Sequence, residues 1–400
     1  MKYEIRIEDG LDDGWTAWFD GMHITNEPDG VTVITGQVAD QAALHGLLAK
    51  VRDLGLELLV HAAHQRRASI ALPKERAMTP IIASEGLDHA LAIETRQLTK
   101  TYPGGVEAVK GIDLAVPPGE VFGLLGPNGA GKSTTVGMLT TTIAPTSGGG
   151  RVAGFDVATH PIAARRASAV VFQEPVVDRG LTGRRNLDVH ARLWGLDAAG
   201  AQKRIAAVVE PFGLGEVIDR PVDSYSGGQR RRLEIARALI SEPQVLFPDE
   251  PTVGLDPRFR FELLDLIAGL RAQGGMTILL TTHYLDEAEQ LCDRVAIVHH
   301  GRIVALDSPA ALLAHMGRDL VELRLAGDVS SAVSSLRAQG LAGDDTFAVG
   351  ATLHIPLHDR PAGETVATIT DLGLGLTAIT SRAPTLDDVY LQLTGESLAA

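Results

Sequence analysis

The sequence has little cysteine, few aromatic residues and less positive than negative charge. Its single cysteine, Cys292, cannot form an internal disulfide, which excludes a disulfide-stapled secreted fold and fits a reducing compartment. Lys and Arg total 36 against 50 Asp and Glu, a net charge of −14. Because nucleic-acid binders need a basic face, we expect no nucleic-acid partner. With 9 Phe, 5 Tyr and 3 Trp, we expect no platform for stacking bases either.

Long apolar runs are also missing. None approaches the ~20 residues that span a bilayer, and the first residues, 1–6, alternate polar and apolar side chains unlike a signal peptide. We therefore expect a soluble chain that another protein must hold if it works at a membrane. Hydrophobic residues make up 45%, an ordinary globular value, and 400 residues predict two to four domains.

The first block, residues 1–60, is predicted to be a small α+β module. Alternating residues predict strands at 3–7, 23–25 and 31–35, with a hairpin turn at 27–30, a helix at 40–54 and a strand at 56–60. Its sequence resembles small bacterial proteins that have no role we can assign, so a docking module and a passive fused domain both stay open.

Residues 61–90 lose this periodicity and are predicted to be a linker. His61 and His64 are at helical spacing and could bind a metal. A solvated pair in a linker is the favoured interpretation, because no third ligand is near in sequence.

The second block, residues 91–317, is predicted to be an α/β domain. Short apolar runs at 121–125, 245–247 and 277–280 each end in polar or charged turns, which is typical of a parallel sheet with functional residues at its C-terminal edge. The third block, residues 318–400, has the β-α-β-β-α-β rhythm of a small α+β accessory domain.

The segment 126–133 has the spacing of a P-loop, and it stands between an apolar strand and an apolar helix. Glycines let backbone N–H groups point inward at phosphate oxygens, and the helix N-terminus adds its positive end. Lys132 supplies a charge to the phosphates, and the Ser133 hydroxyl is a ligand for Mg²⁺. The loop predicts nucleotide contacts from Gly126, Asn128, Gly129, Gly131, Lys132, Ser133 and Thr134.

Two further segments fit the same chemistry. The strand at 245–248 ends in Asp249, expected to hold Mg²⁺ through water, and Glu250, expected to polarise the attacking water. A Ser-Gly-Gly start to a helix at 226–228 predicts a second anion site, which is most simply explained by the nucleotide of a partner subunit. In the basic stretch that follows, Arg231 is interpreted as part of a solvated helix face.

With these residues in view, the second block resembles the nucleotide-binding domain of ABC transporters. The motifs of that family occur in order: an A-loop aromatic at Tyr102, Walker A at 126–134, Q-loop Gln173, the signature at 225–229, Walker B at 245–250, the D-loop at 254–257 and the switch His283. The departures are Tyr225 for Leu in the signature and Pro248 before the Walker B Asp.

The resemblance implies a head-to-tail dimer with each ATP between one Walker A and the opposite signature, Ser226, Gly227, Gly228 and Gln229. It implies that Tyr102 stacks on adenine and that Asp256 links the two sites. It also implies that Gln173 senses the γ-phosphate beside Mg²⁺ and that His283 contacts the γ-phosphate and the water. Since the chain has one such domain, a homodimer or a related ATP-binding chain is implied.

Segment 181–195 resembles the helical subdomain of multidrug-type exporters, although Arg185 stands where Glu is usual. The third block, with its ending at 384–391, resembles the C-terminal domain of the daunorubicin-resistance type of ATP-binding subunit. This resemblance implies a separate permease of the ABC-2 kind, export of a drug-like or lipid-like compound, and a cytoplasmic chain held on the inner face of the cell membrane. Two alternatives remain. One is a soluble ABC-type ATPase with a non-transport partner. The other is a degenerate nucleotide-binding regulator, which the intact Glu250 and His283 disfavour.

Two smaller features have plain interpretations. Cys292, on an apolar-periodic helix, is expected to be a packed small residue rather than a nucleophile. His299 and His300, at the end of a strand, are expected to lie on the surface.

Overall fold

The computed structural model describes residues 2–8, 22–26, 31–37, 57–64, 91–173 and 176–396. The chain divides after Ala83 into two compact units. None of the described helices has the length and the apolar character needed to cross a bilayer.

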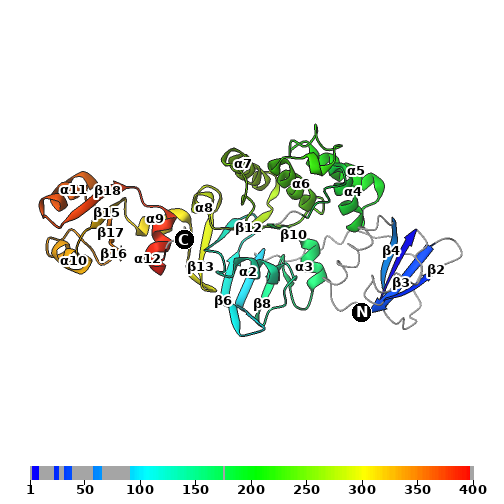
Figure 1. Cartoon of the computed structure of the whole chain (residues 1–400), viewed down its shortest axis with the longest axis horizontal. Helices are drawn as coiled ribbons and strands as arrows, with labels where there is room; N and C mark the ends of the chain where they lie inside the picture. Colours follow the sequence, from blue (N-terminus) through cyan, green and yellow to red (C-terminus); the bar gives the residue numbers. More distant parts are fainter. Residues whose placement is uncertain are drawn as a thin grey trace. The chain divides into compact units, whose positions relative to one another are not determined.

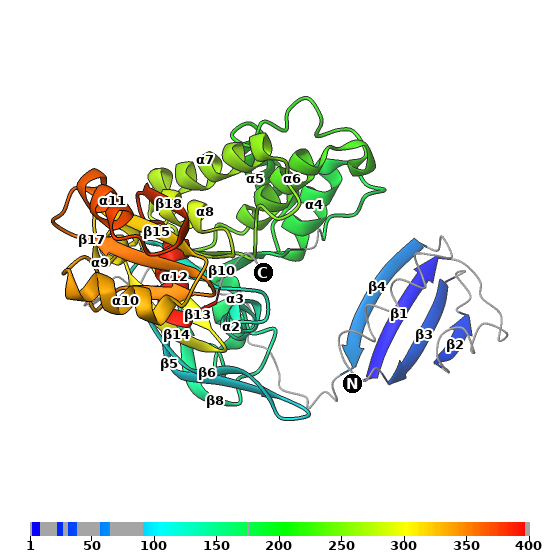
Figure 2. The ribbon, with the colours of Figure 1, turned by 60° about the vertical axis from the view of Figure 1, so that its left-hand side comes forward.

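The first unit contains an antiparallel four-stranded sheet with the order β2-β3-β1-β4 (Figure 2). Its strands are β1 (Lys2–Glu8), β2 (His23–Asn26), β3 (Val31–Gln37) and β4 (Glu57–His64). The pairing of β2 with β3 confirms the predicted hairpin. The helix predicted at 40–54 lies outside the described residues.

The strand β4 corrects the interpretation of His61 and His64. Both lie within β4, so they are not at helical spacing. The helical spacing that suggested a metal site therefore does not apply to them.

The centre of the second unit is a six-stranded sheet with the order β10-β11-β12-β7-β13-β14. The first five strands are parallel, and β14 pairs antiparallel at one edge. The strands are β7 (Val121–Leu125), β10 (Ser168–Val171), β11 (Val245–Pro248), β12 (Thr277–Thr282), β13 (Arg294–His299) and β14 (Arg302–Asp307). The residues of β7, β11 and β12 are buried throughout, as expected of strands covered on both faces.

A second, antiparallel sheet has the order β6-β5-β8-β9. It comprises β5 (Ile93–Tyr102), β6 (Val106–Val116), β8 (Ser147–Val152) and β9 (Phe155–Asp156). Figure 1 shows β6 and β8 beside α2, the helix that follows β7. One apolar core joins this sheet to the central one, because Ile93, Leu98 and Ile112 pack in the same cluster as Phe122 and Phe247.

The helices of this domain follow or precede the central strands. They are α2 (Lys132–Leu139), α3 (Pro161–Ala167), α4 (Gly183–Leu193), α5 (Ala198–Val209), α6 (Gly227–Leu239), α7 (Pro257–Gly274), α8 (Leu285–Leu291) and α9 (Pro309–His315). Cys292 follows α8 and is buried, and burial raises the pKa of its thiol, which confirms the prediction of a packed residue.

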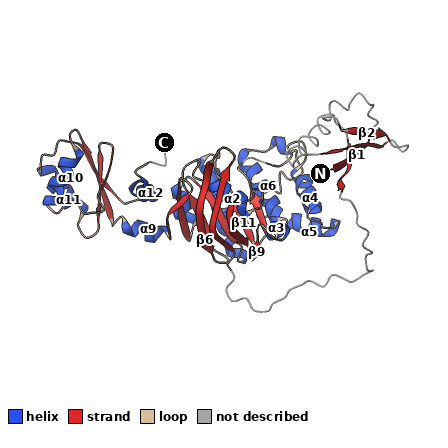
Figure 3. Ribbon diagram, turned by 90° about the horizontal axis from the view of Figure 1, so that it is seen from below, coloured by secondary structure: helices blue, strands red, loops and turns tan. Residues whose placement is uncertain are grey.

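The C-terminal part forms a four-stranded antiparallel sheet of order β16-β17-β15-β18. Figure 3 shows α10 and α11 on one side of this sheet. The elements are β15 (Asp319–Leu325), α10 (Val329–Ala338), β16 (Phe347–Val349), β17 (Thr352–Leu357), α11 (Ala362–Asp371), β18 (Leu376–Arg382) and α12 (Leu386–Thr394). This order confirms the predicted β-α-β-β-α-β rhythm.

The last helix, α12, packs against the preceding domain rather than only against its own sheet. Leu386, Val389 and Tyr390 are buried in the same apolar cluster as Leu291 of α8. The backbone N–H of Leu386 donates to Glu289 of α8 at 2.8 Å. The C-terminal part is therefore attached to the helix that follows the end of β12.

Candidate active site

The P-loop connects β7 to α2, as the sequence predicts. Gly126, Gly129 and Gly131 all have positive φ. A Cβ on Gly126 would lie 2.3 Å from the carbonyl oxygen of Val298, and one on Gly131 would lie 2.4 Å from that of Ala108. Both positions therefore require glycine, whereas Gly129 lies at the open tip of the loop.

Lys132 is the first residue of α2, and its side chain is only 4% exposed. Its Nζ donates to the carbonyl oxygens of Gly126 at 2.7 Å and Pro127 at 3.1 Å. Burial lowers the pKa of Lys132, while the neighbouring carboxylate of Glu250 opposes this shift. The ammonium group of Lys132 is thus held against the backbone of the loop.

Beyond β11, the carboxylate of Asp249 lies beside the first turn of α2. The Ser133 hydroxyl donates to Oδ1 of Asp249 at 3.2 Å, and the Thr281 hydroxyl donates to the same oxygen. A hydroxyl oxygen and a carboxylate oxygen at this separation fit the hard oxygen ligands that Mg²⁺ prefers.

Glu250 is 7% exposed and has a φ of 46°, which is uncommon for a residue with a side chain. Its backbone N–H donates to the carbonyl oxygen of Thr281 at 3.1 Å and to the Thr281 hydroxyl at 2.9 Å. Its Oε1 lies 3.3 Å from Nζ of Lys132 and 3.2 Å from Nδ1 of His283. Lys132 at the start of α2 and His283 after β12 thus both contact the carboxylate of Glu250.

Two other predicted residues, Tyr102 and Gln173, lie beside α2 and after β10, respectively. The Tyr102 hydroxyl is 3.4 Å from Oγ1 of Thr134 in α2. Gln173 is exposed, two residues beyond the end of β10. Among the hydrogen bonds of the described residues, none joins Gln173 to Asp249 or Glu250.

The signature segment forms the start of α6. Ser226 is the N-cap, and its hydroxyl accepts from the backbone N–H of Gln229 at 3.2 Å while the Gln229 side chain accepts from the Ser226 N–H at 2.9 Å. A Cβ on Gly228 would lie 2.5 Å from the ring of Phe259 in α7. Asp256 caps that same helix by accepting from the Phe259 N–H at 3.2 Å. The signature and the D-loop are therefore packed together.

The interpretation of Arg231 as part of a solvated face is wrong. Arg231 is 7% exposed, and its guanidinium donates to the backbone carbonyl oxygens of Pro251, at 2.7 Å, and of Phe172. It also lies 3.6 Å from Glu234. Through these hydrogen bonds, the guanidinium of Arg231 links the turn after β10, which carries Gln173, to the turn after β11, which carries Glu250.

Thr281 is a further site residue that was not predicted, although the sequence carries a signal for it. Thr281 is fully buried in β12, one strand from β11, and a buried hydroxyl needs a partner. It finds two, Asp249 and the N–H of Glu250. The hydroxyl therefore sets the backbone turn that aims both carboxylates.

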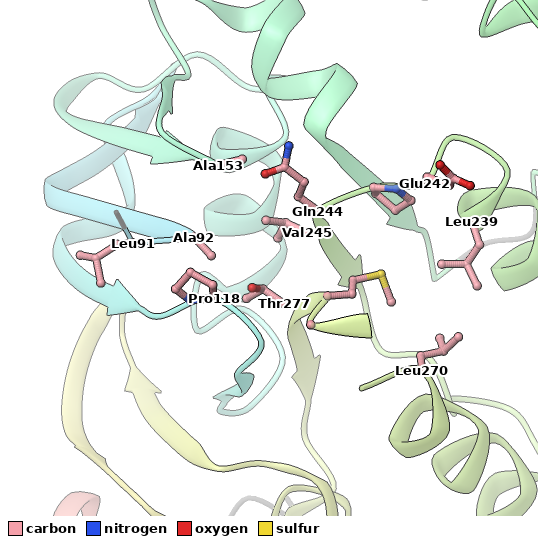
Figure 4. Close-up of a pocket in the computed structure, with 13 residues that line it drawn as sticks. Leu91, Ala92, Pro118, Ala153, Leu239, Glu242, Gln244, Val245, Leu270 and Thr277 are labelled. Atoms are coloured by element: carbon pink, nitrogen blue, oxygen red, sulfur yellow. The ribbon is translucent and has the colours of Figure 1, made fainter. Parts of the chain in front are cut away.

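A pocket of about 720 Å³ lies elsewhere in the domain (Figure 4). Val245 and Thr277, the first residues of β11 and β12, are among its lining residues. Asp249 and Glu250 follow the last residue of β11, at the opposite edge of the sheet. Ligands of parallel α/β sheets bind at the C-terminal edge, so this pocket is not the site described above.

The loop between β7 and α2, with the acidic residues after β11, defines a P-loop nucleotide-binding domain. A family model described as ABC transporter matches residues 109–253. A second family model, a domain of unknown function (DUF8691), matches residues 2–60.

Curated relatives match most of this chain. The daunorubicin/doxorubicin resistance ATP-binding protein DrrA of Streptomyces peucetius is 43% identical over 317 residues, 76% of this chain and 92% of the relative. The linearmycin resistance ATP-binding protein LnrL of Bacillus subtilis is 33% identical over 310 residues, 76% of this chain and 99% of the relative. A Nod factor export ATP-binding protein of Ralstonia nicotianae is 39% identical over 324 residues, 80% and 95% of the two chains.

Solved structures agree on the fold. CbiO1 of Clostridium perfringens, part of an ABC transporter complex, has a TM-score of 0.53 and 26% identity, covering 62% of this chain and 95% of its own. Another ATP-binding subunit of an ABC transporter has a TM-score of 0.51 and 26% identity, covering 70% of this chain and all of its own. The chain belongs to the ABC transporter ATP-binding proteins, as a subunit of the daunorubicin-resistance type with an additional small N-terminal domain. It is an ATPase.

Proposed function

We propose that this chain is the motor subunit of an exporter, which hydrolyses ATP with Mg²⁺ and drives a drug-like or lipid-like compound through a separate permease. The observation that carries the proposal is 43% identity across 92% of a drug-resistance ATP-binding protein, combined with an intact Lys132–Glu250–His283 site. Resistance and export relatives at 33% and 39% identity support the same class.

In this proposal, Lys132 and the backbone N–H groups of Gly126 and residues 128–134 bind the β- and γ-phosphates. Lys132 is already deprived of water, so its interaction with a phosphate is stronger than at an exposed site. Ser133, Asp249 and Gln173 hold Mg²⁺, which neutralises phosphate charge when bound. Tyr102 stacks on the adenine from its position beside α2.

Glu250 polarises the attacking water, and His283 contacts the γ-phosphate. Glu250 has the geometry for this role, because the Thr281 hydrogen bonds fix its backbone and His283 contacts one of its carboxylate oxygens. Phosphoryl transfer needs positioning and electrostatic stabilisation more than covalent participation, and these residues supply both.

The closed state is a head-to-tail dimer, in which Ser226, Gly227, Gly228 and Gln229 cover the ATP of the opposite subunit. Ser226, the N-cap, and Gly227, the first residue, form the exposed N-terminus of the thirteen-residue helix α6. Helix N-termini of this kind bind anions. Because Gly228 packs on Phe259 and Asp256 caps the same helix, the signature and the D-loop move as one block between the two sites. The partner is a second copy or a related ATP-binding chain.

The permease is expected to be of the ABC-2 type, and it would hold this cytoplasmic chain on the inner face of the membrane. The alternative is an ABC-type ATPase with a soluble, non-transport partner. Only the identity of the bound partner separates the two.

The test is affinity recovery from detergent-solubilised membranes of the native host, with Glu250→Gln as bait in the presence of ATP. The matched control is Glu250→Gln combined with Lys132→Met, which lacks the phosphate ligand. ATP-dependent recovery of a polytopic membrane protein is the expected result. Recovery of only ribosomal or other soluble proteins would contradict the transporter proposal and favour the alternative.

A further inference from the structure

Three potential metal ligands meet where the C-terminal helix lies against the turn between β13 and β14. His299 ends β13, His300 follows it, and Glu396 lies just beyond α12. Each residue offers one ligand atom, and the three ligand atoms lie within 4.8 Å of one another. His299 and His300 stand 97 and 96 positions before Glu396 in the sequence, so packing of α12 brings the three residues together.

The backbone holds the two histidines in place from one side. His300 has a φ of 47° and Gly301 a φ of 80°, which makes the turn tight. Gly301 donates to the carbonyl oxygen of Ala130 in the P-loop at 3.0 Å and accepts from the N–H of Lys110 at 2.8 Å. The turn is therefore fixed to the rest of the domain, and the centroids of the two imidazole rings are 4.0 Å apart.

The helix α12 holds the site from the other side. The Tyr390 hydroxyl is buried and lies 2.9 Å from Nδ1 of His299, which sets the orientation of that ring. The prediction of a surface position therefore holds for His300, which is exposed, and not for His299, which is half-buried. Glu396 follows the C-cap Gly395, and its N–H donates to the Thr394 hydroxyl at 3.1 Å.

The charge around the site favours a cation. Among the ion pairs of the described residues, none involves Glu396. A second cluster of similar composition, Glu322, His354 and Asp388, differs in this respect. There the guanidinium of Arg382 already pairs with both carboxylates, so an internal cation satisfies that site.

We propose that His299, His300 and Glu396 bind a divalent transition-metal ion, with Zn²⁺ as the best fit. Two imidazole nitrogens and one carboxylate oxygen are a common zinc ligand set that leaves a position for water. Ligand atoms around tetrahedral zinc are about 3.4 Å apart, so the observed spacing closes with small side-chain rotations. Mg²⁺ prefers oxygen ligands, so the site discriminates against the ion that accompanies ATP.

A metal here would join α12 to a turn that is hydrogen-bonded to the P-loop. Binding to the folded chain alone stabilises it by mass action, so the midpoint of thermal unfolding rises with Zn²⁺ concentration. This inference does not depend on transport or on ATP hydrolysis.

The test uses the full-length chain without an affinity tag, treated with chelator and then dialysed free of it. Zinc chloride is titrated in by calorimetry in the absence of nucleotide, and magnesium chloride is titrated in parallel. One Zn²⁺ per chain is expected at this site. His300→Ala and Glu396→Gln should each weaken that binding by about tenfold or more, and Tyr390→Phe by about tenfold through loss of ring orientation.

The matched control is His315→Ala, which removes an exposed histidine of α9 outside the site. It should leave zinc binding and its effect on thermal unfolding unchanged. Circular dichroism checks that each variant folds, and both ligand variants alter exposed side chains. Absence of Zn²⁺ uptake by the parent chain would overturn the proposal, as would parental affinity in either His300→Ala or Glu396→Gln.

Discussion

Nζ of Lys132 and Oε1 of Glu250 lie 3.3 Å apart, and both side chains are more than nine-tenths buried. The P-loop lysine and the proposed water-polarising carboxylate thus form a buried ion pair. In the proposed function, a phosphate bound in the loop competes with Glu250 for the ammonium group and leaves the carboxylate free to contact water. We propose that this competition links binding of ATP to activation of its hydrolysis.

Removal of the lysine charge should weaken nucleotide binding. Lys132→Met loses a charge-assisted phosphate contact worth roughly 1.5–3 kcal/mol, so ATP affinity should fall at least about tenfold. Equilibrium binding of a fluorescent ATP analogue measures this change. Lys203→Met, an exposed lysine of α5, is the matched control and should bind ATP like the parent. Equal affinity in the two variants would refute the role of Lys132.

The glycines of the P-loop should differ in their tolerance of a methyl group. Gly126→Ala places a Cβ against the Val298 carbonyl, so the loop must shift and both ATP binding and stability should fall. Gly129→Ala meets no atom within 4 Å and carries only the cost of its positive φ, about 1–2 kcal/mol. Thermal unfolding and ATP titration of both variants test this order. A reversed order would contradict the described packing of the loop on β13.

Arg231 should contribute to the stability of the fold, although its place among three consecutive arginines, 230–232, suggests an exposed position. Arg231→Met removes one of the two cations beside the buried Glu234, and it removes the donors from the carbonyls of Pro251 and Phe172. Breaking a buried pair in this way costs roughly 3–5 kcal/mol. Arg230→Met, one position earlier and only half-buried, should change stability by less than about 0.5 kcal/mol. Urea unfolding of the two variants provides the comparison, and similar midpoints would show that Arg231 is solvated.

His190 should make the domain less stable in mild acid. Burial, with a smaller effect of Arg237, lowers the pKa of His190 to about 4, and its Nε2 accepts from the Trp194 indole N–H at 3.0 Å. Because the folded pKa is below the unfolded value of about 6.5, the unfolded chain binds the proton first. Stability from the neutral ring is therefore present above pH 6.5 and is lost as the pH falls towards 4.

Between pH 7 and pH 5 this loss amounts to about 2 kcal/mol. Urea unfolding at the two pH values measures it in the parent chain and in His190→Gln, which cannot be protonated. The parent should lose about 2 kcal/mol more than the variant over this interval. An equal loss in both would show that His190 titrates normally in the folded state.

The sequence was sufficient for parts of the site that are local. The P-loop is a single continuous segment whose glycines, lysine and flanking apolar runs all lie within twenty residues, so strand, loop and helix were all predicted. The carboxylates after β11 were predicted for the same reason. Local pattern also predicted the order of strands and helices in the C-terminal part.

Contacts between distant segments could not be predicted in this way. Arg231 was misread because three consecutive arginines look solvated, although Gly228, Arg231, Glu234 and Ala238 form one buried stripe at helical spacing. Thr281 acts through a neighbouring strand whose place in the sheet is set by topology. The contact of Tyr390 with His299 depends on how α12 packs, and no spacing in the chain encodes it.

The substitution Glu250→Gln keeps the shape of the side chain at the proposed water-polarising position and removes its charge. The measurement is phosphate release together with sedimentation in the presence of ATP and Mg²⁺. We predict that the variant still binds ATP, hydrolyses it about 10²–10⁴-fold more slowly, and sediments as an ATP-dependent dimer. Hydrolysis at the parental rate would contradict the assignment of Glu250, and a variant that stays monomeric with ATP bound would contradict the head-to-tail dimer.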